Sequence, residues 1–363
     1  MKVLNLAEYI DEKLEIKPVT ANRIRSRNGV IDFIKDNKLK RNPETGLYDS
    51  VGNVTVTDEN LVNGKFPVKF GMIRGNFDCN GCKTLTTLEG APTETWLSFN
   101  CDGCVNLKSL EHSPKTVGRN FSCNGCNGLT TLEGAPENVT NTFECNECEN
   151  LISLKGAPKT IKGAFSCKGC TKLKTLEGMS DTEFSVDCSG CVNLVSLKGS
   201  PKKVSAVFSC SRCTSLKTLD GIPEMDFAYL SLSNTSVQNL EGIHGNVKSI
   251  LCSFCHNLVS LKGAPRKVSE EFNCGYTPIE SLDGAPEVVG GEFSCTACKN
   301  LKTLEGAPRE VGGKFDCFNC TNLSSLKGAP EHIGGEFDCR CTLVKPNEAE
   351  KINADGGKVY SRL

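Results

Sequence analysis

Pairs of cysteines are the residues in this 363-residue chain whose type and spacing could do chemistry. All 23 cysteines lie between Cys79 and Cys341, and most occur as Cys-x-x-Cys. Four thiolates from two neighbouring pairs could surround one zinc ion. Thiols in adjacent parallel strands also come within disulfide range. The spacing alone therefore leaves three alternatives, which are zinc sites, disulfides and buried thiols.

The cysteines recur at a fixed interval of 21 or 22 residues. The first cysteines of successive units are Cys79, Cys101, Cys123, Cys145, Cys167, Cys188, Cys210, Cys252, Cys274, Cys295, Cys317 and Cys339. Between Cys210 and Cys252 the period places Ser231 and Asn234 in the two cysteine positions, which gives thirteen units in all. A constant period of this length predicts a solenoid in which every unit is one coil.

A typical unit reads Phe-x-Cys-x-x-Cys-x-x-Leu-x-x-Leu-x-Gly-Ala-Pro, as in residues 293–308. Alternation of Phe and the first Cys with polar residues predicts a short strand that points both into the core. The two leucines bury the next bend, and Pro ends the coil because it fixes φ and has no N–H. The repeat predicts one buried stack of Phe77, Phe121, Phe165, Phe208, Phe272, Phe293, Phe315 and Phe337.

One unit without cysteines carries a family resemblance. Residues 229–240, with Asn234 in the second cysteine position, read like the L-x-x-L-x-L-x-x-N/C-x-L pattern of leucine-rich repeats. The phrases Gly-Gly-x-Phe-x-Cys and Leu-x-Gly-Ala-Pro resemble leucine-rich repeat proteins common in bacteriophage genomes. The resemblance implies a leucine-rich repeat solenoid of mainly parallel β coils with an irregular convex side. In that family a buried Asn or Cys side chain bonds the backbone of the turn that leaves the strand.

The chain divides into four expected parts. Residues 1–50 form a helical N-terminal segment, with a first stripe at Leu6, Ala7, Ile10 and Leu14 and a second near Val30, Ile31 and Ile34. Residues 51–76 form an N-terminal cap with a degenerate coil at Val54, Val56 and Leu61. The solenoid then covers residues 77–341, and residues 342–363 form a C-terminal cap or tail.

Interruptions of the cysteine columns favour buried thiols. Thr277 replaces a second cysteine, the last pair is Cys339-x-Cys341, and Ser231 and Asn234 break both columns. Small polar residues replace a buried thiol well and a thiolate ligand poorly. The sequence therefore predicts no metal site and no cofactor, with a zinc-binding structural repeat as the alternative.

Charge and composition disfavour several classes of function. The 42 Lys and Arg balance 43 Asp and Glu, so nucleic acid is an unlikely partner. Between Arg23 and Arg41 seven basic residues face two acidic ones, which we interpret as a solvated helix face. No run approaches eighteen apolar residues, and the N-terminus lacks a secretory signal, so the sequence predicts a cytoplasmic protein without a membrane partner. If phage-encoded, it acts in the host cytoplasm or on the virion.

No catalytic constellation can be read from the spacing. The four histidines, at positions 112, 244, 256 and 332, lie in different repeat positions. The sequence therefore predicts a protein that is not an enzyme and has no catalytic residue, and an activity within residues 1–75 is a third alternative.

A cluster of apolar residues in four consecutive units is the predicted binding site for a protein partner. The inward positions there are assigned to Phe208, Tyr229, Ile250 and Phe272. The predicted outward residues are Val207, Ala228, Leu230, Leu232, Leu251, Phe254 and Tyr276. Exposed apolar patches commonly mark interaction sites, so we expect a non-enzymatic binding or scaffolding protein. The alternative is local repacking where the cysteines are missing; homo-oligomerisation is left open.

Overall fold

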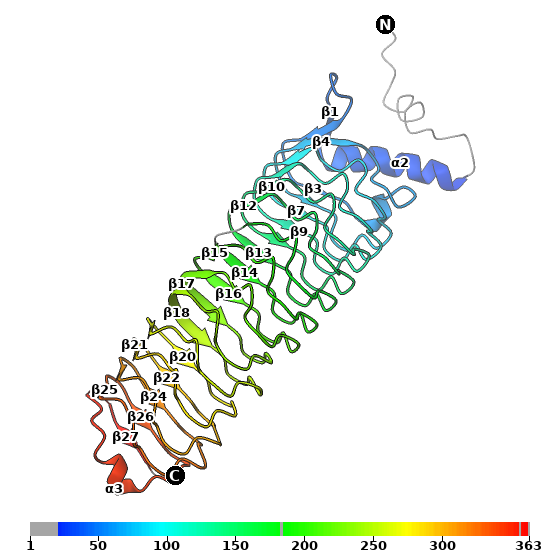
Figure 1. Ribbon diagram of the computed structural model, residues 1–363. Coiled ribbons are helices and arrows are strands. Elements are labelled where there is room, and N and C mark those ends of the chain that lie inside the picture. The colour runs from blue at the N-terminus through cyan, green and yellow to red at the C-terminus, as the bar shows by residue number, and fades with distance from the viewer. Residues whose placement is uncertain (1–20, 182–183, 356, 362–363) are drawn as a thin grey trace.

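The computed structural model describes residues 21–181, 184–355 and 357–361. These residues form a parallel β-solenoid of about fourteen coils. The coils stack in a single row, with helix α2 (Ala21–Asp36) at the N-terminal end and the short helix α3 (Pro346–Ala349) at the C-terminal end (Figure 1). The solenoid expected from the repeat is therefore present.

Each coil contributes two short parallel strands to two ladders. Strands of the first, here called the Val ladder, are β2 (Tyr48–Ser50), β4 (Phe70–Ile73), β6 (Glu94–Thr95), β8 (Thr116–Val117), β10 (Asn138–Val139), β12 (Thr160–Ile161), β15 (Lys203–Val204), β19 (Lys267–Val268), β21 (Val288–Val289), β23 (Glu310–Val311) and β25 (His332–Ile333). The antiparallel strand β1 (Lys40–Arg41) pairs with β2.

The second ladder, here called the Phe ladder, contains the phenylalanines, and most of its strands end directly before the first cysteine position. Its strands are β3 (Val54–Thr55), β5 (Phe77–Asp78), β7 (Phe99–Asn100), β9 (Phe121–Ser122), β11 (Phe143–Glu144), β13 (Ala164–Ser166), β14 (Ser185–Asp187), β16 (Val207–Ser209), β20 (Phe272–Asn273), β22 (Phe293–Ser294), β24 (Phe315–Asp316), β26 (Phe337–Asp338) and β27 (Val359–Tyr360). Two longer strands, β17 (Glu224–Ser231) and β18 (Gly245–Leu251), run through both ladders.

The predicted phenylalanines are all fully buried, but they form two stacks instead of one. From Phe77 to Phe165 successive ring centroids lie 5.2 to 5.5 Å apart. A second stack runs from Phe272 to Phe337 at the same spacing. The inward positions between the stacks belong to Val186, Phe208, Leu230 and Ile250, so aliphatic residues isolate Phe208 from both stacks.

The middle of the solenoid departs from the predicted register by one residue. Phe208 pairs with Leu230, and Val207 pairs with Tyr229, so Leu230 points inward and Tyr229 outward. The assignment of Tyr229 to the core is therefore wrong, as is the placement of Ser231 in the first cysteine column, which belongs to Leu232. The physical cause is an irregularity of β17 between Asp226 and Tyr229, which inserts one residue ahead of the inward position.

The following turn removes the extra residue. Thr235, and not Asn234, takes the second cysteine position, and the next buried residue, Val237, follows after a single intervening residue. At the C-terminal end Thr342 takes the same position as Thr235, and its hydroxyl donates to the Cys339 carbonyl at 2.7 Å. Cys341 is thus not the second member of a pair; it lies in the turn with a φ of 56°.

Both ends of the solenoid are covered. Val30, Phe33 and Ile34 of α2 are buried, so the second expected helical stripe packs onto the first coils. The first stripe, at Leu6, Ala7, Ile10 and Leu14, lies outside the described residues. At the other end β27 pairs with β26 and closes the Phe ladder. Within the described chain, neither helix is both apolar and long enough for a transmembrane segment.

We predict that Phe143→Ala, in the middle of the first stack, lowers the free energy of unfolding by about 3–5 kcal/mol. The ring is fully buried between Phe121 and Phe165, and neither rigid neighbour can fill the cavity. Urea unfolding followed by circular dichroism measures the change. Ile152→Ala is the control, because Ile152 is 59% exposed and its truncation should change stability by less than about 0.5 kcal/mol. Similar losses for the two variants would contradict this account of the core.

Candidate functional site

The cysteines lie inside the coils and act as hydrogen-bond donors between coils. Cys79 Sγ donates to the Asn100 carbonyl of the next coil at 3.3 Å, and Cys104 Sγ donates to the Cys79 carbonyl of the preceding coil at 3.2 Å. The same two bonds recur along the solenoid, as for Cys101 and Cys126. The Asn100 and Cys79 carbonyls also accept the backbone N–H groups of Cys79 and Cys82, so each thiol adds a second hydrogen bond to a carbonyl that is already paired.

Burial raises the pKa of the thiols in the first cysteine column. Burial and the contact with Cys104 raise the pKa of Cys79 well above its ordinary value. Burial raises the pKa of Cys82 to about 12 and that of Cys339 to about 11. A thiol that donates its proton to a carbonyl is not a thiolate, which is the form that binds metal and attacks electrophiles. As placed, the cysteines act in the core and not as a reactive centre.

Other metal and catalytic constellations are not assembled in the part of the chain that the structure describes. No group of three or more His, Cys, Asp or Glu there is arranged to hold a metal ion. The histidines stay apart: His244 Nδ1 lies 2.6 Å from the Gly242 carbonyl, and His332 Nδ1 lies 3.9 Å from Asp355 Oδ2. The site must therefore be sought on the outward face of the Phe ladder.

The predicted apolar patch is only partly on the surface. Ala228, Leu230 and Leu232 are fully buried, because the register shift turns them into the core, so their assignment to a binding surface is wrong. Leu251 is partly buried. Val207, Phe254 and Tyr276 remain exposed at 38%, 39% and 46%. Tyr229, which the sequence interpretation placed in the core, joins them at 40%.

These exposed residues form two separate groups. In the first, Val207 and Tyr229 are neighbours on adjacent strands. The Tyr229 hydroxyl donates to Glu270 Oε2 at 2.7 Å, and Lys248 Nζ lies 5.3 Å from the centre of the tyrosine ring. Lys248 also lies 3.7 Å from Glu270. The hydroxyl of Tyr229 is thus already hydrogen-bonded to a neighbouring side chain of the same face.

The second group is a stacked pair of exposed aromatic rings, Phe254 and Tyr276. Their centroids lie 4.3 Å apart with an interplanar angle of 11°. They sit on the turn that leaves the Phe ladder and line a shallow cavity of about 330 Å³. The other lining residues are His256, Thr277, Pro278, Ala297, Lys299 and Asn300. The cavity combines an aromatic wall with a few polar groups, which is typical of binding sites.

The backbone under this pair is left-handed. Phe254 and Tyr276 have φ values of 59° and 60°. The equivalent residues in the early coils are mostly glycines, such as Gly81 and Gly103, with φ values of 71° and 65°. This conformation costs a side chain roughly 1–2 kcal/mol, and bulky residues adopt it rarely. Two aromatic residues are therefore kept where the backbone favours glycine.

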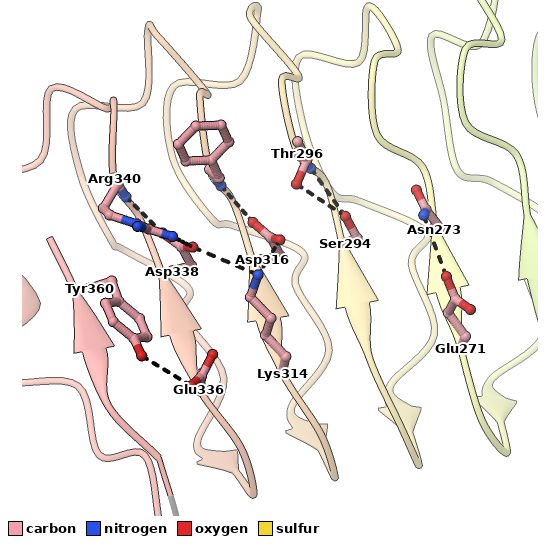
Figure 2. Close-up of polar contacts among 11 residues, drawn as sticks. Glu271, Asn273, Ser294, Thr296, Lys314, Asp316, Glu336, Asp338, Arg340 and Tyr360 are labelled. Carbon is pink, nitrogen blue, oxygen red and sulfur yellow. Dashed lines mark hydrogen bonds and ion pairs between the residues drawn. The ribbon is translucent and has the colours of Figure 1, made fainter. Parts of the chain in front are cut away.

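A network of charged side chains covers the last coils of the same face (Figure 2). Asp338 is 1% exposed and accepts two hydrogen bonds from Arg340, from Nε at 2.9 Å and from a terminal nitrogen at 2.6 Å. Lys314 Nζ lies 2.5 Å from Asp316 and 3.7 Å from Asp338. Burial alone would raise the pKa of Asp338, but the hydrogen bonds from Arg340 outweigh it and hold that pKa below its usual value.

The network is acidic overall and leaves three carboxylates, those of Glu271, Glu292 and Glu336, without an ion pair among the residues described. Glu271, Glu292, Asp316, Glu336 and Asp338 face only two basic residues, Lys314 and Arg340. Glu336 accepts a hydrogen bond from the Tyr360 hydroxyl at 3.1 Å (Figure 2). Glu292 makes no ion pair with any residue described, and burial raises its pKa. The sequence signalled this acidity but not the network, because the order of residues does not show that Arg340 covers Asp338.

In the early coils the corresponding carboxylates are hydrogen-bonded by neutral Ser and Asn side chains instead of Lys and Arg. Ser122 Oγ donates to Asp102 at 2.5 Å, and Asn124 Nδ2 donates to Glu144 at 3.1 Å. Further along, Ser189 and Ser209 are bonded at 2.7 Å, as are Ser211 and Ser231 at 2.6 Å. The outward face therefore changes along its length from small polar ladders, through exposed aromatics, to an acidic network.

Comparison with known proteins adds no relative. No protein-family model, curated protein or solved structure matches the chain. The function must therefore be argued from the geometry of this surface.

The burial of the thiols predicts a clear labelling pattern. A thiol reagent at about pH 8 should modify roughly one cysteine of the native protein, Cys341, because it is only partly buried and the other cysteines are buried. The denatured protein should expose all 23 thiols. Spectrophotometric counting measures both numbers, with metal analysis of the same sample. Release of several zinc ions on denaturation would contradict the assignment of the thiols as core donors.

The raised thiol pKa values also predict loss of stability at high pH. An unfolded thiol ionises near pH 8.5, whereas thiols of the first cysteine column such as Cys79 and Cys123 have a pKa well above the ordinary value. Their contribution is therefore complete below about pH 8.5 and declines as the pH rises through 9 to 11, by up to about 1.4 kcal/mol per pH unit for each thiol. Urea midpoints across this range measure the slope. Cys123→Ser should reduce the slope by the contribution of about one thiol. An unchanged slope would contradict the assignment of this slope to buried thiols.

Proposed function

We propose that the chain is a non-enzymatic binding protein that captures a protein partner on the outward face of the Phe ladder. The observation that carries the proposal is the Phe254–Tyr276 pair, two stacked rings exposed to solvent on strained backbone. Strain that persists where a simpler residue would fit is a reason to infer function. Aromatic anchors in a shallow cavity also dominate the binding energy of many protein interfaces.

The neighbouring charges indicate the chemistry of the partner. The coils that follow Tyr276 carry the acidic network, and Glu292 there is available for an ion pair. A partner segment with an apolar or aromatic anchor and basic residues beside it would satisfy both features. The Val207–Tyr229 group lies on the same face, on the N-terminal side of Phe254, and extends the proposed surface.

The proposal includes the leucine-rich repeat assignment drawn from the sequence resemblance. It is supported by the second cysteine of each pair, which bonds a turn carbonyl as the Asn/Cys column does in that family. By the same resemblance we propose a phage-encoded protein that acts in the host cytoplasm or on the virion. A zinc-binding structural role is the alternative, and the thiol count described above distinguishes it.

We predict that Phe254→Gly with Tyr276→Gly abolishes partner capture without harming the fold. Glycine accepts the left-handed backbone, so the relief of strain offsets the lost ring contact, and stability should stay within about 1 kcal/mol of the original. Each anchor should contribute about 2 kcal/mol or more to binding, so the double variant should bind at least several hundred-fold more weakly. Pull-down from the producing cell, identification of the captured protein and titration with that protein measure the effect.

Asn234→Gly with Asn319→Gly is the matched control. Both asparagines occupy the same turn position in other coils, with φ values of 61°, and neither carries a ring. This control should capture the partner as the original chain does. Retention of full affinity by the Phe254→Gly/Tyr276→Gly variant would place the site elsewhere.

A further inference from the structure

A cleft of about 450 Å³ opens beside strands β1, β2 and β4. Figure 1 shows β1 and β4 at the N-terminal end of the solenoid. Its volume is within the range of small-molecule sites. Four basic and two acidic residues line it, namely Lys38, Lys40, Arg41, Arg74, Glu44 and Asp49. Val51, which is 74% exposed, and Met72 add apolar surface. The cleft thus joins positive charge to an apolar wall, and it is remote in the chain from Phe254 and Tyr276.

The end of α2 holds Lys38 at the rim of this cleft. The Leu39 N–H donates to the Ile34 carbonyl at 2.9 Å, and the Lys38 N–H donates to the Lys35 carbonyl at 3.0 Å. These two bonds form a Schellman motif in which Lys38 has a φ of 51°. Glycine is the usual residue there. The last carbonyls of the helix already have backbone donors, so the lysine is not required as a cap.

Three of the four basic residues that line the cleft have no carboxylate partner among the described residues. Within residues 21–181, 184–355 and 357–361, no carboxylate makes an ion pair with Lys38, Lys40 or Arg74. The Arg74 guanidinium lies 5.0 Å from the ring centre of Trp96, an exposed residue, which orients it without neutralising it.

Of the two acidic residues that line the cleft, Asp49 accepts hydrogen bonds from neutral donors. Asp49 Oδ1 accepts the Met72 N–H at 2.8 Å, and Asp49 Oδ2 accepts Asn42 Nδ2 at 3.2 Å. Its oxygens are therefore committed to fixing the β2–β4 junction. The lining as a whole keeps an excess of positive charge.

We propose that this cleft binds a small organic phosphate of about nucleotide size. Lysine ammonium groups and an arginine fork are the side chains that bind phosphate oxygens best. In this arrangement Lys38, Lys40 and Arg74 bind the phosphate, and Val51 and Met72 contact the organic body. An isolated phosphate ion would leave most of the cleft empty. A long nucleic acid needs a continuous basic stripe, which the chain's net charge of -1 disfavours.

The test is calorimetric titration of the full chain with adenosine 5′-monophosphate as the probe. We expect a dissociation constant below about 1 mM, which weakens as salt is added. Inorganic phosphate lacks the organic body and adenosine lacks the phosphate, so each should bind at least about tenfold more weakly than the nucleotide.

Lys38→Gly combined with Lys40→Ala should weaken binding of the nucleotide at least about tenfold. Glycine suits the left-handed position of Lys38, so this variant should fold as well as the original chain. Lys174→Ala combined with Lys217→Ala removes the same charge from exposed positions in the middle of the solenoid and should leave the affinity unchanged.

Three results would overturn the proposal. They are absence of nucleotide binding at about 1 mM, equal affinity for adenosine or inorganic phosphate, and undiminished affinity in the Lys38→Gly/Lys40→Ala variant. None of these results bears on the protein partner, because Phe254 and Tyr276 are unchanged in every sample. Failure of this site and failure of the proposed function can therefore be distinguished.

Discussion

Each coil of this protein must hydrogen-bond to the coils before and after it, and the rest of the structure depends on that constraint. Parallel pairing places equivalent residues of successive coils directly above one another. A coil of about 22 residues cannot enclose a core, so its apolar residues are buried only by continuing columns. At some glycines the backbone of the preceding coil leaves no room for a side chain. A Cβ at Gly156 would lie 2.5 Å from the Cα of Glu133.

The cysteines follow from the same constraint. The first cysteine of a unit donates to a carbonyl of the next coil, and the second donates to a carbonyl of the preceding coil, as in the bonds of Cys79 and Cys104. A thiol is small enough for the column, and its own buried donor group finds an acceptor there. Thr235, Thr277 and Thr342 replace it because a hydroxyl of similar size also bonds at the turn. A residue pattern that suggests metal chemistry in isolation thus has a different use when it repeats in a stacked core.

Much of the fold could be predicted from the sequence, since period, strand alternation and inward columns all follow from stacking. The register around Tyr229 could not, because the count assumed an uninterrupted period and β17 contains an extra residue. A signal was available. The sequences around Thr235–Val237, Thr277–Ile279 and Thr342–Val344 share a threonine followed two positions later by a buried aliphatic residue. Aligning Leu232 with Cys274 on that pattern would have placed Leu230 in the core.

The candidate site was harder to predict because the outward face is free of the stacking constraint. Inward positions repeat since each must fit its neighbours, whereas outward positions can vary from Ser122 to Asp316 without disturbing the coil. Phe254 and Tyr276 are exposed because of a left-handed turn conformation. The early coils have the same conformation at this position, where the residue is mostly glycine. The position tolerates any side chain that points to solvent, at a cost in backbone energy. The other coils place glycine or a non-aromatic residue at this turn position, whereas two adjacent coils place the aromatic rings of Phe254 and Tyr276 there, and this departure from the repeat is the most informative about function.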